Sequence, residues 1–282
     1  MITIMGASGR VGGAVLETVA QAGHPVRALS RTPPPETRPN VEWQAVEALD
    51  SVALAAAFAG SAAVFVMNPI AAGADDVTGQ AARLSVAVAA ALRQAGTRYA
   101  VALSSQGAHL AGGTGIVTTL HDFEAALRDT PTQIAFLRPA MFMESWLPAA
   151  AIASGTACMP AFLAPLDRAI DTVSAVDVGR AAGRLLLSPR PGIFNLTGPR
   201  RYSERDAAAI LTRQTGRSIR ADPIPETEIA AFHMAAGLGA SFSEGIAGIY
   251  IALNSYVIHL AHDSSHSLRC DTPMDAVLAQ VN

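Results

Sequence analysis

Residues 2–13 of this chain read ITIMGASGRVGG, and this stretch decides its fold. The first four residues are apolar or β-branched and predict a buried strand, whereas the residues from Arg10 onward predict a helix. Between them, Gly6, Gly9 and Gly12 give the spacing G-x-x-G-x-x-G. Glycines at a strand-to-helix turn let the backbone approach a pyrophosphate, which the helix N-terminus then faces. The stretch predicts a dinucleotide-binding unit with Ser8 as an added hydroxyl, and a tight turn without a ligand is the alternative.

Apolar runs bounded by turns alternate with helical patterns through the first half of the chain. The runs predict strands at residues 2–6, 25–31, 41–46, 62–69, 99–105 and 133–139. Repeated strand–helix–strand units predict an α/β fold, a doubly wound Rossmann-type parallel sheet that binds ligands at the carboxyl ends of its strands.

Beyond residue 139 the pattern becomes irregular, which is typical of a cap or a functional loop. We predict a Rossmann-type domain at residues 1–147 and a smaller C-terminal α+β cap at 148–282, from which about 171–196 return to the first domain. A later helix is expected at 203–216, with Ser203 as N-cap and Asp206 completing a capping box. The apolar residues 246–261 are too few to span a bilayer and predict a buried helix.

Composition excludes several classes of protein. The chain has 282 residues, a net charge of -3 and no lysine, so all 20 basic residues are arginines. Without lysine there is no Schiff base, no P-loop and no Tyr-x-x-x-Lys pair of the standard short-chain dehydrogenases. The small net charge favours neither nucleic acid nor a membrane as partner. Cys158 and Cys270 form no CxxC motif, and with no secretory signal pattern at the N-terminus they favour a cytoplasmic location.

The end of the second strand selects the dinucleotide. An acid at this position binds the ribose hydroxyl of NAD, whereas an arginine suits the 2′-phosphate of NADP. Here Ser30 and Arg31 end the strand and no acid precedes Glu36. A guanidinium offers two parallel donors to a phosphate, so the sequence favours NADP(H). An arginine that only contacts solvent is the alternative.

Four stretches in order resemble the NmrA-like family of atypical short-chain dehydrogenases. They are residues 1–33, 121–145, 173–187 and 192–219. The family includes NAD(P)H quinone oxidoreductases of the type-2 kind, isoflavone-type reductases and NADP-sensing regulators. The resemblance runs from Met1 to about Pro225, and it implies the fold without fixing an activity.

The resemblance implies roles for a set of residues around the cofactor. The pyrophosphate would be held by Gly6, Ser8, Gly9, Arg10 and Val11, and the 2′-phosphate by Arg31. The ribose would be bordered by Met67, Asn68 and Pro69, and the nicotinamide by Ser104 and Ser105. The substrate cleft would begin at Met141 and Phe142.

The expected catalytic acid is His121. Active proteins that resemble this chain carry a Lys or His four residues before a Glu, here Glu124, but that position is Leu120 and the histidine stands one residue later. One residue turns a side chain by about 100° around a helix. His121 is the candidate for donating a proton to a carbonyl or quinone oxygen, and an exposed helix residue is the alternative.

A cluster of His259, His262, Asp263 and His266 lacks a recognised ligand spacing, and we expect no metal there. Because only 5% of the residues are aromatic, aliphatic and Met side chains, such as Met141, Met143 and Met159, are expected to line the cleft.

These features predict an NADPH-dependent oxidoreductase that reduces a small quinone or carbonyl compound, as a possible homodimer. The alternatives are a non-catalytic NADP(H)-sensing protein that binds a partner protein, and an isomerase or dehydratase that uses the cofactor structurally. A usable proton donor beside the nicotinamide separates the first two.

Overall fold

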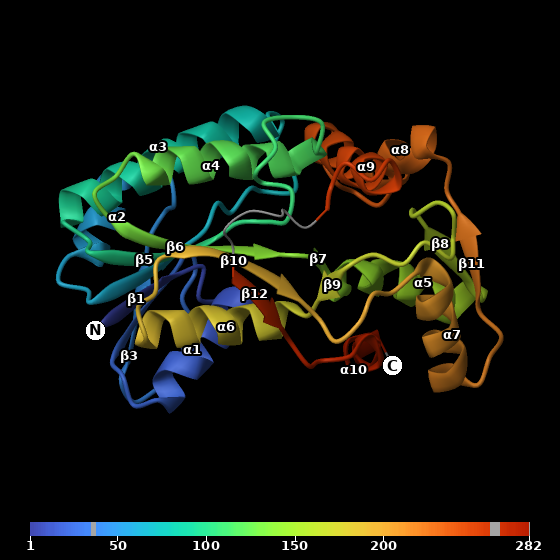
Figure 1. The fold of residues 1–282 in the computed structure, drawn as a ribbon, viewed down its shortest axis with the longest axis horizontal. Helices are drawn as coiled ribbons and strands as arrows, with labels where there is room; N and C mark the ends of the chain where they lie inside the picture. Colours follow the sequence, from blue (N-terminus) through green and yellow to red (C-terminus); the bar gives the residue numbers. More distant parts are fainter. Residues whose placement is uncertain (35–37, 260–265, 282) are drawn as a thin grey trace.

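A computed structural model describes residues 1–34, 38–259 and 266–281. Its centre is a parallel sheet of eight strands in the order β12-β10-β6-β5-β4-β1-β2-β3 (Figure 1). The strands are β1 (Ile2–Met5), β2 (Val26–Ser30), β3 (Val41–Ala45), β4 (Ala63–Val66), β5 (Tyr99–Leu103), β6 (Gln133–Pro139), β10 (Gly192–Thr197) and β12 (His266–Arg269). The strand order reverses between β1 and β4, where doubly wound sheets open a ligand crevice.

Helices cover both faces of this sheet, as its fully buried inner strands require. On one face lie α2 (Ser51–Phe58), α3 (Val77–Ala95) and α4 (Thr118–Arg128), and on the other lie α1 (Arg10–Gln21) and α6 (Ala175–Leu187) (Figure 1). Strand β4 reads AVFV and is buried along its whole length. The predicted Rossmann-type α/β fold is confirmed.

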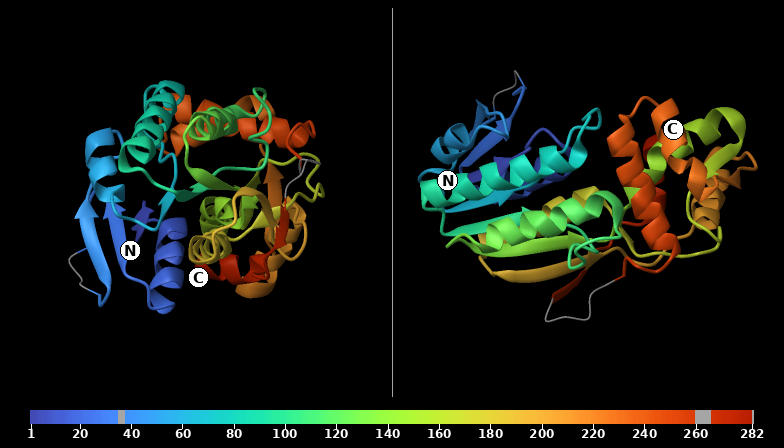
Figure 2. Two further views of the ribbon diagram at one scale, coloured as in Figure 1. Left: turned by 60° about the vertical axis from the view of Figure 1, so that its left-hand side comes forward. Right: turned by 90° about the horizontal axis from the view of Figure 1, so that it is seen from above.

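A second hydrophobic core lies beyond the carboxyl ends of the strands, at the end of the molecule opposite the N-terminus (Figure 2). Its helices are α5 (Leu147–Thr156), α7 (Glu204–Thr215), α8 (Ile229–Ala235), α9 (Ala240–Asn254) and α10 (Met274–Leu278). Two small parallel pairs join it, namely β8 (Cys158–Ala161) with β11 (Arg220–Pro223), and β7 (Met141–Phe142) with β9 (Thr172–Val173). Short 3-10 turns are η1 (Gly115–Val117), η2 (Met143–Trp146), η3 (Glu226–Glu228) and η4 (Ala279–Val281). We call this unit the cap.

Local predictions in the cap had mixed outcomes. The capping box of α7 is confirmed, because Ser203 Oγ accepts from the Asp206 N–H and Asp206 accepts from the Ser203 N–H at 2.9 Å. The irregular stretch after residue 139 instead contains α5 and β8. The helix expected at 246–261 is α9, which starts earlier, ends at Asn254 and is only partly buried. No described helix is long and apolar enough to cross a membrane.

Candidate functional site

The glycine loop makes a tight turn between β1 and α1. Gly6 has a φ of +67°, which favours glycine, and its carbonyl accepts from the Gly9 N–H at 3.0 Å. A Cβ at Gly12 would overlap the Gly6 carbonyl oxygen. Gly9 is the N-cap of α1 and supplies no capping side chain. The first amides of this helix are therefore available to an anion.

A cleft of about 520 Å³ opens above this loop, at the carboxyl ends of β1, β2 and β4. Of the predicted cofactor residues it is lined by Gly6, Ser8, Gly9, Arg10, Val11, Arg31, Met67 and Pro69. Arg10 and Arg31 are exposed, and neither pairs with a carboxylate among the described residues. The cleft also has two acids: Glu47 is exposed, whereas the carboxylate of Glu144 accepts two bonds from the Ala175 N–H, each 3.0 Å long.

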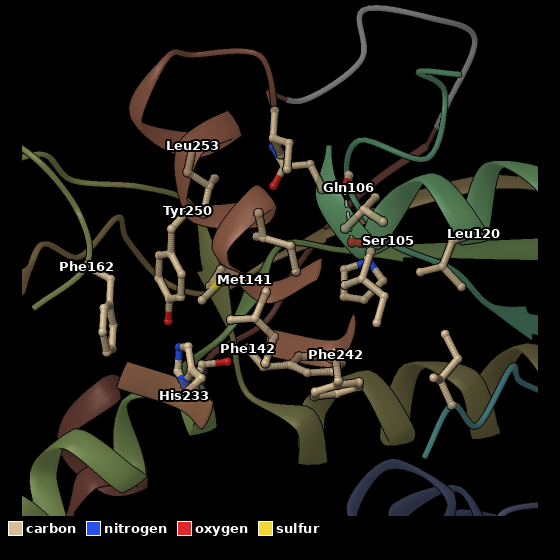
Figure 3. Close-up of a pocket in the computed structure, with 18 of the residues that line it drawn as sticks. Ser105, Gln106, Leu120, Met141, Phe142, Phe162, His233, Phe242, Tyr250 and Leu253 are labelled. Atoms are coloured by element: carbon tan, nitrogen blue, oxygen red, sulfur yellow. Dashed lines mark hydrogen bonds between the residues drawn. The ribbon is translucent and has the colours of Figure 1, made fainter. Parts of the chain in front are cut away.

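A larger cavity of about 710 Å³ adjoins the cleft (Figure 3). The two spaces share Met67, Pro69, Ile70, Leu103 and Phe142. Of the predicted residues, the larger cavity is lined by Met67, Asn68, Pro69, Ser104, Ser105, Met141 and Phe142. No Asp, Glu or Arg stands among the described residues that line it. The structure thus joins an open helix N-terminus to an uncharged space large enough for a drug-sized molecule.

Serines at the end of β5 form the polar floor of this cavity. Ser104 Oγ donates to Glu124 Oε1 at 2.5 Å, and Ser105 Oγ donates to the Gln106 carbonyl at 3.0 Å. Glu124 is fully buried and receives two bonds from the guanidinium of Arg138, of 2.8 and 2.7 Å, and one from Arg128 at 2.6 Å. The glutamate therefore fixes the direction of the Ser104 hydroxyl.

Asn68 is fixed in a similar way at the end of β4. Its Nδ2 donates to the Ala81 carbonyl at 3.0 Å and to Ser85 Oγ at 3.1 Å, both on α3. Its Oδ1 is buried and has no hydrogen-bond partner among the described residues. This oxygen is an unused acceptor on a residue that lines the larger cavity.

His121 lies outside the described lining of the cavity, whereas its neighbour Leu120 is part of it. The Nδ1 atom of His121 is 3.0 Å from the Ala108 carbonyl oxygen, so the ring is held by the loop that precedes α4. Because the histidine stands at position 121 and not at 120, its side chain contacts this loop and not the cavity. The geometry does not support His121 as the proton donor.

The cap wall carries aromatic side chains that the sequence analysis missed. Besides Phe142 they are Phe162, Phe232, His233, Phe242 and Tyr250 (Figure 3). Of the expected aliphatic and Met lining, the aliphatic side chains and Met141 line the cavity, but Met143 and Met159 do not, because they are fully buried in the cap core. Low aromatic content says nothing about where the few aromatic residues gather.

Glu204 accepts hydrogen bonds from residues within and next to this aromatic wall. Its carboxylate accepts from Trp146 Nε1 at 2.7 Å and from the backbone N–H groups of Phe162 and Leu163 at 3.0 and 3.1 Å. Burial raises the pKa of Glu204, and the three donors oppose that rise. Burial, with the charge of Glu204 added, also raises the pKa of Tyr250, whose phenol stays neutral at physiological pH.

With this geometry in place, comparison with known proteins identifies the family. The model of the NmrA-like family matches residues 1–250. The chain belongs to the NmrA-like family. The resemblance seen in the sequence is therefore confirmed.

Solved structures with the same fold include several NAD(P)-related enzymes. The NADPH-dependent quinone oxidoreductase QOR2 from Escherichia coli, complexed with NADPH, has a TM-score of 0.75 and 20% identity, covering 100% of this chain and 99% of that chain. The triphenylmethane reductase of Citrobacter sp. complexed with NADP(H) has a TM-score of 0.77 and 20% identity, with the same coverage. A nucleoside-diphosphate-sugar epimerase from Staphylococcus aureus has a TM-score of 0.81 and 16% identity, covering 98% and 99%. A search of curated proteins returns no match.

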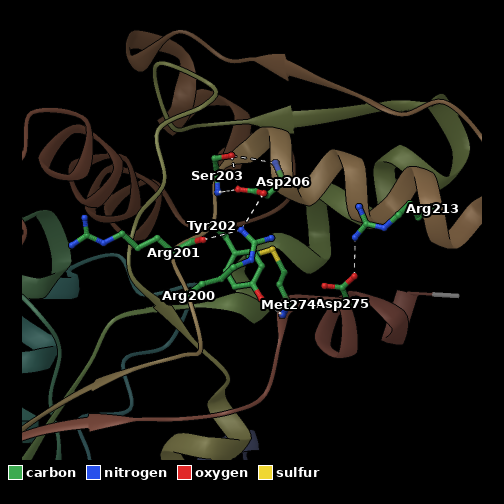
Figure 4. Close-up of polar contacts among 8 residues, drawn as sticks. All are labelled: Arg200, Arg201, Tyr202, Ser203, Asp206, Arg213, Met274 and Asp275. Carbon is green, nitrogen blue, oxygen red and sulfur yellow. Dashed lines mark hydrogen bonds and ion pairs between the residues drawn. The ribbon is translucent and has the colours of Figure 1, made fainter.

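The arginines around Ser203 form ion pairs with acids. Arg200 pairs with Asp206 at 3.2 Å (Figure 4). Arg201 pairs with Asp171 at 3.0 Å. These pairs give the stretch mixed charges, so it is not a purely basic patch.

The histidine cluster near the C-terminus is only partly described, since His262 and Asp263 lie outside the described residues. His259 Nδ1 is 3.0 Å from the Val257 carbonyl oxygen, and the described part of the chain holds no group of metal ligands.

Proposed function

We propose that this protein is an NADPH-dependent oxidoreductase that reduces a small, uncharged quinone or carbonyl compound by hydride transfer. The observation that carries the proposal is the shared border of the two spaces, formed by Met67, Leu103 and Phe142 among others. A dinucleotide held on the glycine loop has its reactive end at this border. The neighbours crystallised with NADPH or NADP(H) support the choice of cofactor.

The residues of the cleft fit a phosphorylated dinucleotide. The close Gly6–Gly12 contact leaves room for a pyrophosphate beside Gly6 and Gly9, whose oxygens the amides of Arg10 and Val11 would bind together with the Ser8 hydroxyl. Arg31, which has no acid partner among the described residues, binds the 2′-phosphate. NADPH bound here supplies the hydride.

At the border of the two spaces, Met67, Asn68 and Pro69 would border the ribose, and Ser104 and Ser105, which line the larger cavity, would border the nicotinamide. The Ser104 hydrogen is committed to Glu124, which leaves an oxygen lone pair as an acceptor. Apolar side chains such as Met141 and Phe142 exclude water from the substrate and thereby strengthen these polar contacts. An uncharged lining disfavours anionic and cationic substrates, because no opposite charge compensates their desolvation.

The chemistry needs little acid catalysis from the chain. A quinone that accepts the hydride becomes a hydroquinone anion, which takes up one proton from water on leaving the cavity. We do not assign this proton to His121, whose ring contacts the Ala108 carbonyl.

The test is the loss of NADPH absorbance with 1,4-naphthoquinone and benzaldehyde, together with NADPH and NADH titrations. We expect turnover of NADPH. We expect Arg31→Ala to weaken NADPH binding by roughly 10- to 100-fold, because a hydrogen bond to a charged group contributes about 1.5–3 kcal/mol. The same variant should leave NADH binding unchanged, since NADH lacks the 2′-phosphate. Arg205→Ala is the matched control, because Arg205 is exposed on α7 and lines neither space.

Two results would count against the proposal. Tight NADPH binding without turnover contradicts the oxidoreductase and favours the NADP(H)-sensing alternative. An unchanged cofactor preference in Arg31→Ala contradicts the phosphate assignment.

A further inference from the structure

Two polar groups on the cap side of the larger cavity have no hydrogen-bond partner among the described residues. The Nε2 atom of His233 is buried and unpartnered. The hydroxyl of Tyr250 likewise makes no hydrogen bond with the described part of the chain, although Tyr250 is only 6% exposed. Leaving a buried polar atom such as His233 Nε2 unpaired is unfavourable, and the Tyr250 hydroxyl lies with it in an otherwise apolar wall, so both groups call for a partner.

These groups come from different helices and face the same space. His233 belongs to α8 and Tyr250 to α9, and their rings are nearly parallel, with centroids 6.5 Å apart and an interplanar angle of 12°. Figure 3 shows the Tyr250 hydroxyl turned toward His233, in the space that Phe162 also borders. Phe162 packs against both rings, with centroids 4.9 and 5.1 Å away.

We propose that Tyr250 and His233 form a second polar subsite, which binds a carbonyl or hydroxyl oxygen of an uncharged aromatic substrate. The Tyr250 hydroxyl donates to this oxygen, and the imidazole ring orients the hydroxyl and offers a second hydrogen bond. The surrounding Phe162 and Phe232 rings pack against an aromatic body.

The chemistry of the pair selects the kind of oxygen. Burial lowers the pKa of His233, so its ring is neutral at physiological pH and contributes no positive charge. The Glu204 carboxylate, whose charge raises the pKa of Tyr250, repels an anionic group in the same place. A carboxylate or phosphate is therefore disfavoured, whereas a neutral carbonyl fits.

This subsite deepens the proposed function and rests on it for the position of the reacting end. The serines of β5 lie at the sheet side of the cavity and the Tyr250–His233 pair lies on the cap side. A substrate with oxygens on opposite sides of an aromatic ring system contacts both sides at once. A para-quinone has this arrangement, whereas an aromatic ketone with one carbonyl does not.

The experiment measures binding of 1,4-naphthoquinone and of naphthalene, which has the same ring system without oxygens, to the protein saturated with NADP⁺, which cannot reduce the quinone. We expect Tyr250→Phe and His233→Phe each to weaken naphthoquinone binding by about five- to tenfold, and to change naphthalene binding by less than about twofold. Tyr256→Phe is the matched control, because Tyr256 is 72% exposed and lines neither space.

An equal loss for both ligands, no loss for either, or no binding of naphthoquinone to the unaltered protein would overturn the subsite. Selective loss of binding in a protein that oxidises no NADPH would leave the subsite standing and overturn the oxidoreductase. Thermal melting of both variants shows whether they fold, and the naphthalene measurement reports on the cavity itself.

Discussion

Glu124→Gln removes one negative charge from the buried network beneath the cavity floor. In the folded protein Glu124 has no exposed surface and Arg138 is 3% exposed. The carboxylate accepts hydrogen bonds from Ser104, from Arg128 and from the Nε and Nη2 atoms of Arg138, all between 2.5 and 2.8 Å. A neutral amide keeps the shape and removes the negative charge that the Arg138 guanidinium faces at this position.

Removing one partner of a buried ion pair destabilises by about 3–5 kcal/mol, because the remaining charge is desolvated and uncompensated. We expect Glu124→Gln to lower the free energy of unfolding by this amount. The double replacement Glu124→Leu with Arg138→Leu should be less destabilising than the single one, because it leaves no charge of the pair in the interior. Urea denaturation is the assay, since urea does not screen charges.

Glu42→Gln is the matched control. Glu42 faces Arg27 at 3.9 Å on the surface with half of its side chain exposed, and such a pair contributes less than about 1 kcal/mol. A loss below about 1 kcal/mol for Glu124→Gln, with an unchanged dependence on urea, would refute the buried-pair argument. So would a double variant less stable than the single one.

Three further predictions follow from the contacts. Gly12→Ala should abolish NADPH binding in titrations while the protein stays folded by circular dichroism, because the new Cβ overlaps the Gly6 carbonyl oxygen and displaces the loop; unchanged affinity would contradict this. Burial lowers the pKa of His233 in the folded protein, so just below the ordinary histidine pKa the unfolded chain binds more protons than the folded one, and stability falls as the pH falls through that window. His233→Phe should flatten this part of a profile of urea stability against pH, and parallel profiles of the two proteins would refute this. Burial raises the pKa of the Cys270 thiol to about 11, so iodoacetamide at pH 8 should label the partly exposed Cys158 and not Cys270 in the folded protein, and both cysteines after unfolding. Peptide mass spectra measure the labelling, and equal labelling of the folded protein would refute this.

The sequence predicted the first domain well because its signals are local. A buried strand, three spaced glycines and a helix specify the loop at Gly6, and alternating apolar runs specify the parallel sheet. The capping box at Ser203 is likewise a signal within four residues. The sequence named His121 as the proton donor and noted its offset of one residue, but it did not predict that Leu120 would line the cavity. The domain boundary at residue 147 stays a prediction.

The cap wall was not predictable in the same way, because long-range packing assembles it. Phe162 follows β8, His233 lies on α8 and Tyr250 on α9, and no periodic pattern links them. Helix α9 has an apolar sequence that indicated burial, yet one side of it lines a cavity, and apolar periodicity does not distinguish a core face from a binding face. Met143 and Met159 illustrate the reverse error, since both fill the cap core.

The cofactor cleft and the larger cavity are lined mostly by different elements, and this affects how the protein distinguishes ligands. The described lining of the cofactor cleft comes from the glycine loop, the ends of strands in the central sheet, residues 46–49 after β3, and α2 and α3, with Phe142, Glu144 and Ala175 in addition. Helices α8 and α9 contribute only to the larger cavity. Substitutions on these two helices should therefore change the choice of substrate without changing the affinity for NADPH. Met67 and Phe142 border both spaces, so only substitutions at the shared border should couple the two affinities. Titrations of NADPH and naphthoquinone with Tyr250→Phe and Phe142→Leu separate these cases, and a change of NADPH affinity in Tyr250→Phe would show that the two spaces are not independent.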